Sequence, residues 1–385
     1  MTAAAYADNN PQAYNPFAPP PKEKTAYEWL HPPLAKLIQA LSIKAAGDTP
    51  IGWRLPSVIF GTAIIPAVFL FSFLLFGPVV AVFSTLVISF ENLNLVMSRI
   101  AMNDIFVTFF ILSSFIFTVL YRRSGKTRYL ILTAIFLGLS ASTKWTGIYA
   151  IGIVFGYLVF YDARKRSFKF RHLLLLILPA AIYLASYGQF WLQGHTVLDF
   201  INLHKQIWWY QNRRDLVHPY GTTPIFCAPK GLVGDKYFCP WVWDVRPTYF
   251  SYEQYGENSG YIHALGNPLV FWFGSAAVLY FVVTVLHRKK SEGLILVLLG
   301  YFAFWVPWVF SPRILFLHHY LPSIPFLATC LGLGIAKIWQ SKFKLAAILI
   351  VGLIALAFFY FYPITSGYPI KTASIEGYMW FKTWR

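Results

Sequence analysis

Charged side chains are scarce in this sequence of 385 residues. Asp, Glu, Lys and Arg together make up 12% of the chain, whereas soluble domains carry about a quarter. Hydrophobic residues reach 57%, and the mean hydropathy is +0.54. So little charge excludes a chain that stays in water by itself. We therefore expect an all-α integral membrane protein that crosses the bilayer many times.

Acidic residues are the scarcer charge: 15 Asp and Glu stand against 32 Lys and Arg, a net charge of +17. In a soluble protein this excess would suggest nucleic acid as a partner. No basic stripe lies on a soluble domain here, so nucleic acid is not expected. Basic residues instead hold the short loops of a membrane protein on the cytoplasmic side.

Cysteine is nearly absent, with three residues in the whole chain. None has a zinc-type C-x-x-C spacing. Cys330 lies in an apolar run and is typical of a packed core residue, whereas Cys227 and Cys239 share one polar loop and would form a disulfide if that loop is exported. A zinc site would need the histidines of the same region, whose spacing does not support one. Those histidines are His195, His204 and His218.

The first 50 residues contain no apolar run of signal-peptide length. They are rich in proline and are expected to form a loop, with one short amphipathic helix after Pro33. That helix would carry its large apolar residues on one face. They are Leu34, Leu37, Ile38 and Leu41.

Ten apolar segments follow, and a spanning helix needs about 20 residues. The expected spans are 55–75, 79–97, 101–121, 129–143, 146–162, 173–191, 268–287, 293–310, 319–338 and 344–362. They divide the chain into an external loop with an amphipathic helix, an N-terminal bundle, a second external loop, a C-terminal bundle and an external tail. The corresponding boundaries are 1–50, 51–191, 192–267, 268–362 and 363–385.

Four basic loops give the expected orientation. They contain Arg122 to Arg128, Arg164 to Arg171, Arg288 to Lys290 and Lys337 to Lys344. An even number of spans separates each loop from the next, so all four lie on one side, which the positive-inside rule makes the cytoplasm. Residues 1–50, 192–267 and 363–385 are then expected outside the cell membrane.

Several charged residues remain at the outer ends of the expected spans, where they oppose the positive-inside trend. They are Arg54, Arg99, Asp104, Lys144, Arg313, His318 and His319. Charge in or beside a membrane is costly unless it is paired or functional. For Arg54 the alternative is a side chain that reaches the interface, and for Asp104 a counter-ion to a neighbouring helix. Convergent cations favour an anionic ligand, so we expect a site for a phosphate-bearing lipid.

The motifs extend this interpretation. In order they are HPPLAKLIQA at 31–40, SRIAMNDIF at 98–106, STKWTG at 142–147, HPY at 218–220, RPTYF at 246–250, GNPLVFW at 266–272 and HHYLPSIPF at 318–326. Together they resemble the dolichyl-phosphate-mannose protein O-mannosyltransferase family, whose members have the GT-C glycosyltransferase fold. The resemblance covers nearly the whole chain.

The resemblance implies an enzyme that transfers mannose from a polyprenyl or dolichyl monophosphate to a Ser or Thr hydroxyl of an exported protein, with inversion in one displacement. It implies no cofactor and no metal, an active site on the external face of the cell membrane, and a possible dimer. A carboxylate would take the hydroxyl proton. Cationic residues would stabilise the departing phosphate.

The resemblance also implies roles for residues. Asp104 and Arg54 would act in catalysis, and the donor phosphate would be bound by Arg313, Arg54, Lys144 and Arg99. Substrate contacts from the loops would come from His31, His218, Arg246, His318, His319 and Tyr320.

One departure concerns the catalytic carboxylate. The family carries an Asp-Glu pair early in its first outer loop, and no such pair precedes HPPL here. Asp8 stands alone, and Glu23 and Glu28 lie close to His31. The family also has one span more than the ten counted here. We expect both differences if the chain begins inside the first outer loop, with the base upstream of Met1. The alternatives are Asp8 as a substitute base and an inactive member.

Two other classes of function are considered. A related transferase would move another sugar, such as aminoarabinose, to lipid or glycan, but the HPY, RPTYF and GNP motifs favour protein acceptors. A transporter or lipid-binding membrane protein would place polar groups near the bilayer midplane and show an internal repeat. Neither feature is seen in the sequence.

Overall fold

The computed structural model describes residues 1–22, 26–164, 169–216, 218, 220–227, 237–287 and 291–385. Three of the four basic loops keep described residues. Lys165, Arg166, residues 288–290, Glu23 and Pro219 of the HPY motif lie outside the described part. The chain divides into two compact units: Met1–Phe60 with Ser98–Arg214, called the first unit, and Gly61–Met97 with Asp215–Arg385, called the second unit.

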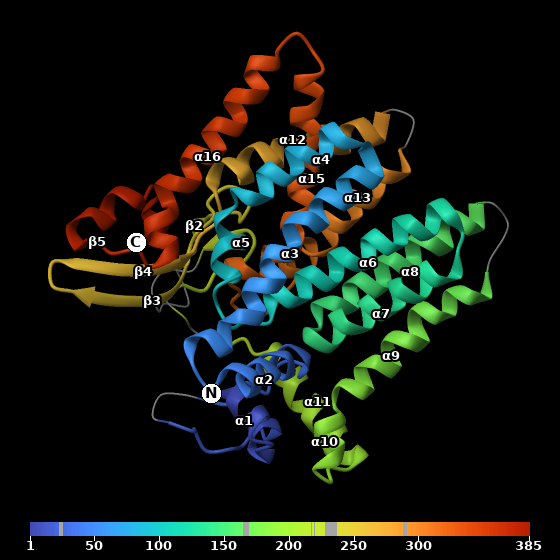
Figure 1. The fold of residues 1–385 in the computed structure, drawn as a ribbon, viewed down its shortest axis with the longest axis vertical. Coiled ribbons are helices and arrows are strands. Elements are labelled where there is room, and N and C mark those ends of the chain that lie inside the picture. The colour runs from blue at the N-terminus through green and yellow to red at the C-terminus, as the bar shows by residue number, and fades with distance from the viewer. Residues whose placement is uncertain (23–25, 165–168, 217, 219, 228–236, 288–290) are drawn as a thin grey trace. The chain divides into compact units, whose positions relative to one another are not determined.

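The first unit is helical (Figure 1). Its elements are α1 (Thr2–Ala7), η1 (Pro11–Tyr14), α2 (Leu34–Ala46), the start of α3 (Pro50–Phe76), α6 (Asp104–Ser124), α7 (Thr127–Thr143), α8 (Thr146–Arg164), η2 (Phe170–Leu173), α9 (Leu174–Ser186), α10 (Gly188–Leu192) and α11 (Val197–Gln211). Helices α6, α7 and α8 lie side by side, and α9 packs on α7.

The second unit contains the rest of α3 and a longer set of elements. Its helices are α4 (Pro78–Ser89), α5 (Asn92–Met97), α12 (Pro268–His287), α13 (Glu292–Ala303), α14 (Val306–Val309), η3 (Leu317–Ser323), α15 (Ile324–Trp339), α16 (Lys344–Ser366), η4 (Thr372–Tyr378) and η5 (Lys382–Trp384). Its strands are β1 (Phe226–Cys227), β2 (Tyr237–Phe238), β3 (Thr248–Tyr255), β4 (Asn258–Ala264) and β5 (Ile370–Lys371). Helix α15 packs against α4, α12 and α16.

Among the described residues, seven helical segments are long and apolar enough to cross a membrane, and three shorter apolar helices accompany them. The shorter ones are Pro78–Ser89, Thr127–Thr143 and Phe170–Ser186. Each of these ten helical segments overlaps one of the expected spans, so the hydropathy pattern predicted their positions correctly. The fold is that of a polytopic helical membrane protein.

The ends of α6 show why the sequence starts and stops a helix where it does. Asp104 lies in its first turn, and Arg122 and Arg123 lie in its last turn. Each sign of charge is favourable at that end of the helix dipole. The helix ends at Gly125, whose φ of 67° is the left-handed conformation that glycine adopts without a steric penalty.

The expected span 79–97 is wrong in one respect, because it is broken. Helix α4 ends at Ser89, and the separate helix α5 begins at Asn92. Between them the buried Glu91 accepts hydrogen bonds from the backbone N–H of Asn94 at 2.7 Å and of Asn267 at 3.0 Å. A buried carboxylate needs hydrogen-bond donors. In a continuous helix the backbone N–H of Asn94 would instead bond a backbone carbonyl of the preceding turn.

The N-terminal segment also differs from the expected loop. Residues Thr2–Ala7 form α1, which packs against α2. Helix α2 lies where it was expected, but its buried face is the other one. Its buried residues are Ala35, Gln39, Ala40 and Ile43. Leu41, predicted on the apolar face, exposes 68% of its surface. The two alanines permit close packing on the protein, while Leu37 is partly buried against the same core.

Residues 192–267 and the tail are more ordered than an external loop and tail imply. Helix α11 opens with a capping box in which Thr196 and Asp199 exchange side-chain hydrogen bonds with backbone N–H groups. Strands β3 and β4 form an antiparallel hairpin, and β5 from the tail adds to the edge of β4 (Figure 1). The fold is therefore mostly helical and not purely so.

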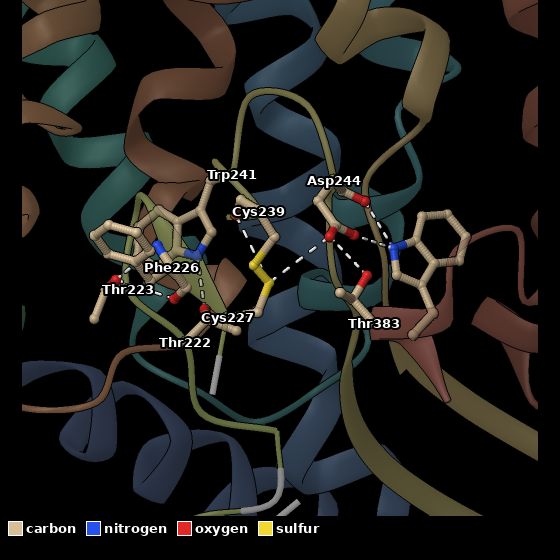
Figure 2. Close-up of a disulfide and its surroundings, with 9 residues drawn as sticks. Thr222, Thr223, Phe226, Cys227, Cys239, Trp241, Asp244 and Thr383 are labelled. Atoms are coloured by element: carbon tan, nitrogen blue, oxygen red, sulfur yellow. Dashed lines mark hydrogen bonds between the residues drawn. A yellow bond between two sulfur atoms is a disulfide. The ribbon is translucent and has the colours of Figure 1, made fainter. Parts of the chain in front are cut away.

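Cys227 and Cys239 are joined in a disulfide, and both are buried (Figure 2). Beside it, the buried carboxylate of Asp244 accepts hydrogen bonds from Thr383 Oγ1 at 2.6 Å and Trp384 Nε1 at 2.6 Å. Trp384 Nε1 also donates to the Asp244 carbonyl at 2.7 Å. These bonds fasten the C-terminal residues of the chain to the disulfide-bonded segment within the second unit.

Removal of this disulfide should lower stability. It closes a loop with a sequence separation of 12 residues, for which the chain-entropy model gives about 3 kcal/mol. We expect the double variant Cys227→Ser/Cys239→Ser to melt at a lower temperature than the wild type in detergent. A reductant should lower the wild-type melting temperature and leave that of the double variant unchanged. Equal melting of the two proteins without reductant would contradict the prediction.

Candidate functional site

A buried ion pair lies at one end of the α6–α7 hairpin. Asp104 is the first residue of α6, and Lys144 follows α7 in an extended conformation. Because the two helices run antiparallel, the start of one and the end of the other meet at the same end. Lys144 Nζ donates to Asp104 Oδ1 at 2.7 Å, and the side chains expose 6% and 3% of their surfaces. Among the open alternatives, the geometry favours Asp104 as a counter-ion.

A second pair lies in the segment that carries HPPL. Glu28 Oε2 is 2.9 Å from Lys36 Nζ, in the first turn of α2, and Asn103 Nδ2 donates to Glu28 Oε1 at 3.2 Å. His31 Nε2 is 3.9 Å from the same oxygen. Asn103, which binds Glu28, directly precedes Asp104. The carboxylates of Glu28 and Asp104 are therefore linked through the start of α6.

The charges around His31 set the protonation of this cluster. Burial lowers the pKa of His31 from 6.5 to about 4, although the Glu28 carboxylate acts in the opposite direction. Lys144 and Asp104 also affect the pKa of His31, with opposite signs, so both ion pairs are within electrostatic reach of the imidazole. Burial alone would raise the pKa of Glu28, but Lys36 and His31 outweigh it and the net pKa is lowered. At neutral pH the imidazole of His31 is therefore neutral, and Glu28 is a carboxylate.

Three further predicted residues of the first unit lie in more open positions. Arg54 is exposed near the start of α3. Arg99 is half-buried in the connection between α5 and α6. Asp8 is exposed and forms the C-cap of α1.

In the second unit, the segment that carries Arg313 is tied to the residues after HPY. Thr222 and Leu315 exchange two backbone hydrogen bonds of 2.7 Å. Arg313 is half-buried, and its Nε donates to the Ile314 carbonyl at 3.4 Å. The structure thus joins the residues just after HPY to the segment just before HHYLPSIPF.

The histidines of HHYLP belong to a stack of rings. His318 stacks on His319 with centroids 4.7 Å apart, and Phe316 stacks on His318 at 5.5 Å. His218 meets the Phe316 ring edge-on at 4.9 Å. Burial lowers the pKa of His218, which favours its neutral form. Backbone N–H of Phe316 donates to His319 Nδ1 at 3.2 Å, and this bond closes the start of η3.

Arg246 and Tyr320 are both inside the second unit. Arg246 exposes 4% of its surface; burial lowers its pKa and the carboxylate of Asp244 opposes that effect. Burial likewise raises the pKa of Asp244, against the hydrogen bonds from Thr383 and Trp384. Tyr320 is fully buried, and its hydroxyl donates to Tyr301 OH at 2.8 Å. These positions favour a structural part for Tyr320 in the core.

Sequence reasoning missed Glu28, Lys36 and Asn103. The sequence argument places Glu28 too close to His31 to stand for the family's Asp-Glu pair and gives it no other role. The i,i+3 spacing of Glu28 and His31, with Lys36 inside the quoted HPPLAK motif, was the signal that could have found them. It also missed Asp244, which no motif contains.

Both halves of the chain match models of one family. Residues 30–188 match the model described as dolichyl-phosphate-mannose-protein mannosyltransferase. Residues 196–384 match the C-terminal four TMM region of protein-O-mannosyltransferase. The chain belongs to the protein O-mannosyltransferase family. The first matched region contains Asp104 and Lys144, and Glu28 lies just before it; the second contains Arg313 and the histidines of HHYLP.

Curated relatives agree over most of the chain. It is 26% identical to a polyprenol-phosphate-mannose–protein mannosyltransferase of Corynebacterium glutamicum, over 92% of this chain and 81% of that protein. Identity to the protein of the same name from Mycobacterium tuberculosis is 23%, with coverage of 92% and 81%.

Solved structures show the same fold. The Saccharomyces cerevisiae protein O-mannosyltransferase Pmt1–Pmt2 complex bound to the sugar donor matches with a TM-score of 0.78 at 15% identity, over 99% of this chain and 88% of that chain. ArnT from Cupriavidus metallidurans bound to undecaprenyl phosphate matches with a TM-score of 0.57 at 14% identity, over 86% and 55%. The protein O-mannosyltransferase fold of this chain is thus a GT-C fold.

The Asp104–Lys144 pair should be essential to the fold of the first unit. Lys144→Met leaves a buried carboxylate without its lysine partner, so we expect a loss of about 3–5 kcal/mol. Asp104→Asn/Lys144→Met should recover a large part of that loss. Thermal melting in detergent measures both. Lys126→Met, at an exposed lysine, is the control and should stay within about 0.5 kcal/mol of the wild type. A harmless Lys144→Met would refute the pair's role.

His31 should make stability depend on pH. Its folded pKa of about 4 lies below the ordinary 6.5. Between these values the unfolded chain binds a proton that the folded chain does not, so stability falls as the pH falls. The loss at pH 5 relative to pH 7.5 should be about 2 kcal/mol. Melting at both values should show a smaller difference for His31→Asn, while His287→Asn, at an exposed histidine, should follow the wild type. Identical pH dependence in all three would contradict the prediction.

Proposed function

We propose that this chain transfers mannose from a polyprenyl monophosphate donor to Ser or Thr hydroxyls of exported proteins, with inversion at the sugar carbon. The observation that carries the proposal is the ordered match of both halves to protein O-mannosyltransferase models, over residues 30–188 and 196–384. The curated names of the relatives, which match over 92% of the chain, support the same donor and acceptor classes.

The reaction forms one bond and breaks one. The acceptor oxygen bonds to the anomeric carbon of mannose, and the bond from that carbon to the phosphate oxygen breaks. The hydroxyl proton passes to a carboxylate, and polyprenyl monophosphate leaves with the bonding electron pair. Cations that face the phosphate stabilise the negative charge that develops on it. From the resemblance we propose this role for Arg313 and, as separate predictions, for Arg54 and Arg99, because guanidinium binds phosphate with several donors.

The carboxylate that takes the proton must be available. Glu28 and Asp104 are held by Lys36 and Lys144 in the first unit. Asp8 is exposed and is the acid of the N-terminal segment that we would test first as a base. Transfer by Asp8→Asn at the wild-type rate would exclude it.

We propose that the reaction takes place at the external face of the cell membrane. The basic loops and the Cys227–Cys239 disulfide support this side, because disulfides persist in oxidising compartments. Cysteines introduced at Lys126 and Asp215 should react with impermeant reagents from opposite sides. Reaction of both from one side would refute the orientation.

The proposal includes no cofactor besides the lipid-linked donor. EDTA should therefore leave the transfer rate unchanged, and loss of transfer that Mg²⁺ or Mn²⁺ restores would overturn this part. A second copy of the chain as a partner stays a prediction.

The transfer assay tests the proposed function and the role of Arg313. Purified protein would be given polyprenyl-phosphate [³H]mannose and a peptide rich in Ser and Thr. We expect radioactive peptide from the wild type, and a decrease in kcat/KM of about 100-fold for Arg313→Ala. Arg128→Ala, at an exposed residue of a basic loop, is the matched control and should transfer as the wild type does.

Two outcomes would contradict the proposal. Equal transfer by Arg313→Ala and the wild type would refute the phosphate role of that residue. Transfer to lipid and none to peptide would favour the related sugar–lipid transferase class.

A further inference from the structure

A cavity of about 440 Å³ lies wholly within the first unit, between the N-terminal segment and α10–α11. We call it the N-terminal pocket. It is lined by Pro11, Gln12, Tyr14, Asn15, Pro16, Phe17, Phe190, His195, Asp199, Asn202, Leu203, Lys205 and Gln206. Its volume is within the range of ligand pockets, about 300–1,000 Å³. None of the residues predicted for catalysis or phosphate binding lines it.

The wall formed by the N-terminal segment is held in place by hydrogen bonds. Gln189 Nε2 donates to the Tyr6 carbonyl at 2.8 Å and to Asn9 Oδ1 at 2.9 Å. Gln193 Nε2 donates to the Asn9 carbonyl at 3.1 Å. Tyr14 is buried, and its ring packs edge-on against Phe190 at 5.3 Å. The pocket is therefore preformed rather than assembled by the ligand.

The side of the pocket formed by α11 suits an extended polypeptide. Asn202 and Gln206 are four residues apart, so both amides lie on one face, about 6 Å apart along the helix axis. In an extended polypeptide, the N–H and C=O groups that point to the same side recur at every second residue, a distance of about 6.6–6.8 Å. Each side-chain amide both donates and accepts. Two such amides at this spacing match the N–H and C=O groups of alternate residues.

The remaining lining offers apolar contact to a polypeptide. Phe190 gives one face to His195, at 4.2 Å between centroids, and meets the edge of Tyr14. These rings have little open face on which a sugar could stack. The prolines and Phe17, which exposes 77% of its surface, instead offer apolar contact to small side chains. His195 Nε2 is buried and has no hydrogen-bond partner among the described residues, so it is available to a ligand.

We propose that the N-terminal pocket binds the acceptor polypeptide in extended conformation, at residues that flank the modified Ser or Thr. This inference rests on the proposed function and deepens it, because it assigns acceptor recognition to Asn202, Gln206 and Phe17. Four of the polar side chains in its lining are amides, and Tyr14, His195, Asp199 and Lys205 lie beside them. The Asp199 carboxylate is already engaged in the capping box of α11.

The test compares kinetics for the two substrates. For Asn202→Ala/Gln206→Ala we expect the KM for a Ser/Thr peptide to rise about tenfold, as the loss of two neutral hydrogen bonds implies, with the KM for polyprenyl-phosphate mannose and kcat unchanged. Phe17→Ser, at a highly exposed residue that supports no core, should raise the peptide KM without loss of folding. Leu198→Ala is the matched control, because Leu198 is exposed on the same helix and does not line the pocket.

A binding measurement separates this inference from the proposed function. Fluorescence anisotropy of the labelled peptide, without donor, should show weaker binding to the double variant than to the Leu198→Ala control. If wild type binds the peptide but transfers no mannose, the proposed function fails and the pocket assignment stands. If transfer occurs and the peptide KM is equal in all variants, the pocket assignment fails alone. A raised donor KM, or tighter binding of mannosylated than of bare peptide, would also overturn it in favour of a lipid or glycan site.

Discussion

The buried ion pair of Asp104 and Lys144 is the interaction on which the polar end of the first unit depends. Two charges that expose 3% and 6% of their surfaces lose most of their hydration, and only a short, direct contact offsets that cost. The pair joins the start of α6 to the residue that ends α7, and Asn103 links the same turn to Glu28. These contacts connect the ends of α6 and α7 to the HPPL segment, so that their polar side chains form one cluster within a mostly apolar unit.

Acidic residues are scarce in this chain, and the buried ones hold different segments together. The chain has 15 Asp and Glu, and among the described residues four are almost fully buried. They are Glu91, Asp104, Asp162 and Asp244. Two of them accept hydrogen bonds from distant parts of the chain: Glu91 from Asn267, and Asp244 from Thr383 and Trp384. A buried carboxylate without hydrogen-bond partners would cost several kcal/mol of folding free energy. Each buried carboxylate therefore connects the segments that supply its partners.

Hydropathy predicted the ten apolar helices because a long apolar run has few other stable arrangements in a bilayer. The same cost argument singled out Asp104 and Lys144, since charge in an apolar run demands a reason. It could not find Glu28 or Lys36, because they lie in a polar, proline-rich segment where charge is unremarkable. Nor could it place the break at Glu91, whose donors come partly from Asn267, far along the chain. Local pattern cannot report such distant partners, nor which face of α2 meets protein.

The ion pairs of Lys144 and Lys36 also change which cations we expect to bind the donor phosphate. Lys144 was predicted to bind the donor phosphate, but its ammonium is bound to Asp104 at 2.7 Å, and Lys36 is bound to Glu28 at 2.9 Å. A lysine is a compact point charge, and moving it to a phosphate would leave a buried carboxylate unpaired. An arginine has five donors in a planar fork and keeps donors when one is engaged. The arginines are therefore the residues that we propose for phosphate binding, whereas Lys144 and Lys36 pair with the carboxylates of Asp104 and Glu28.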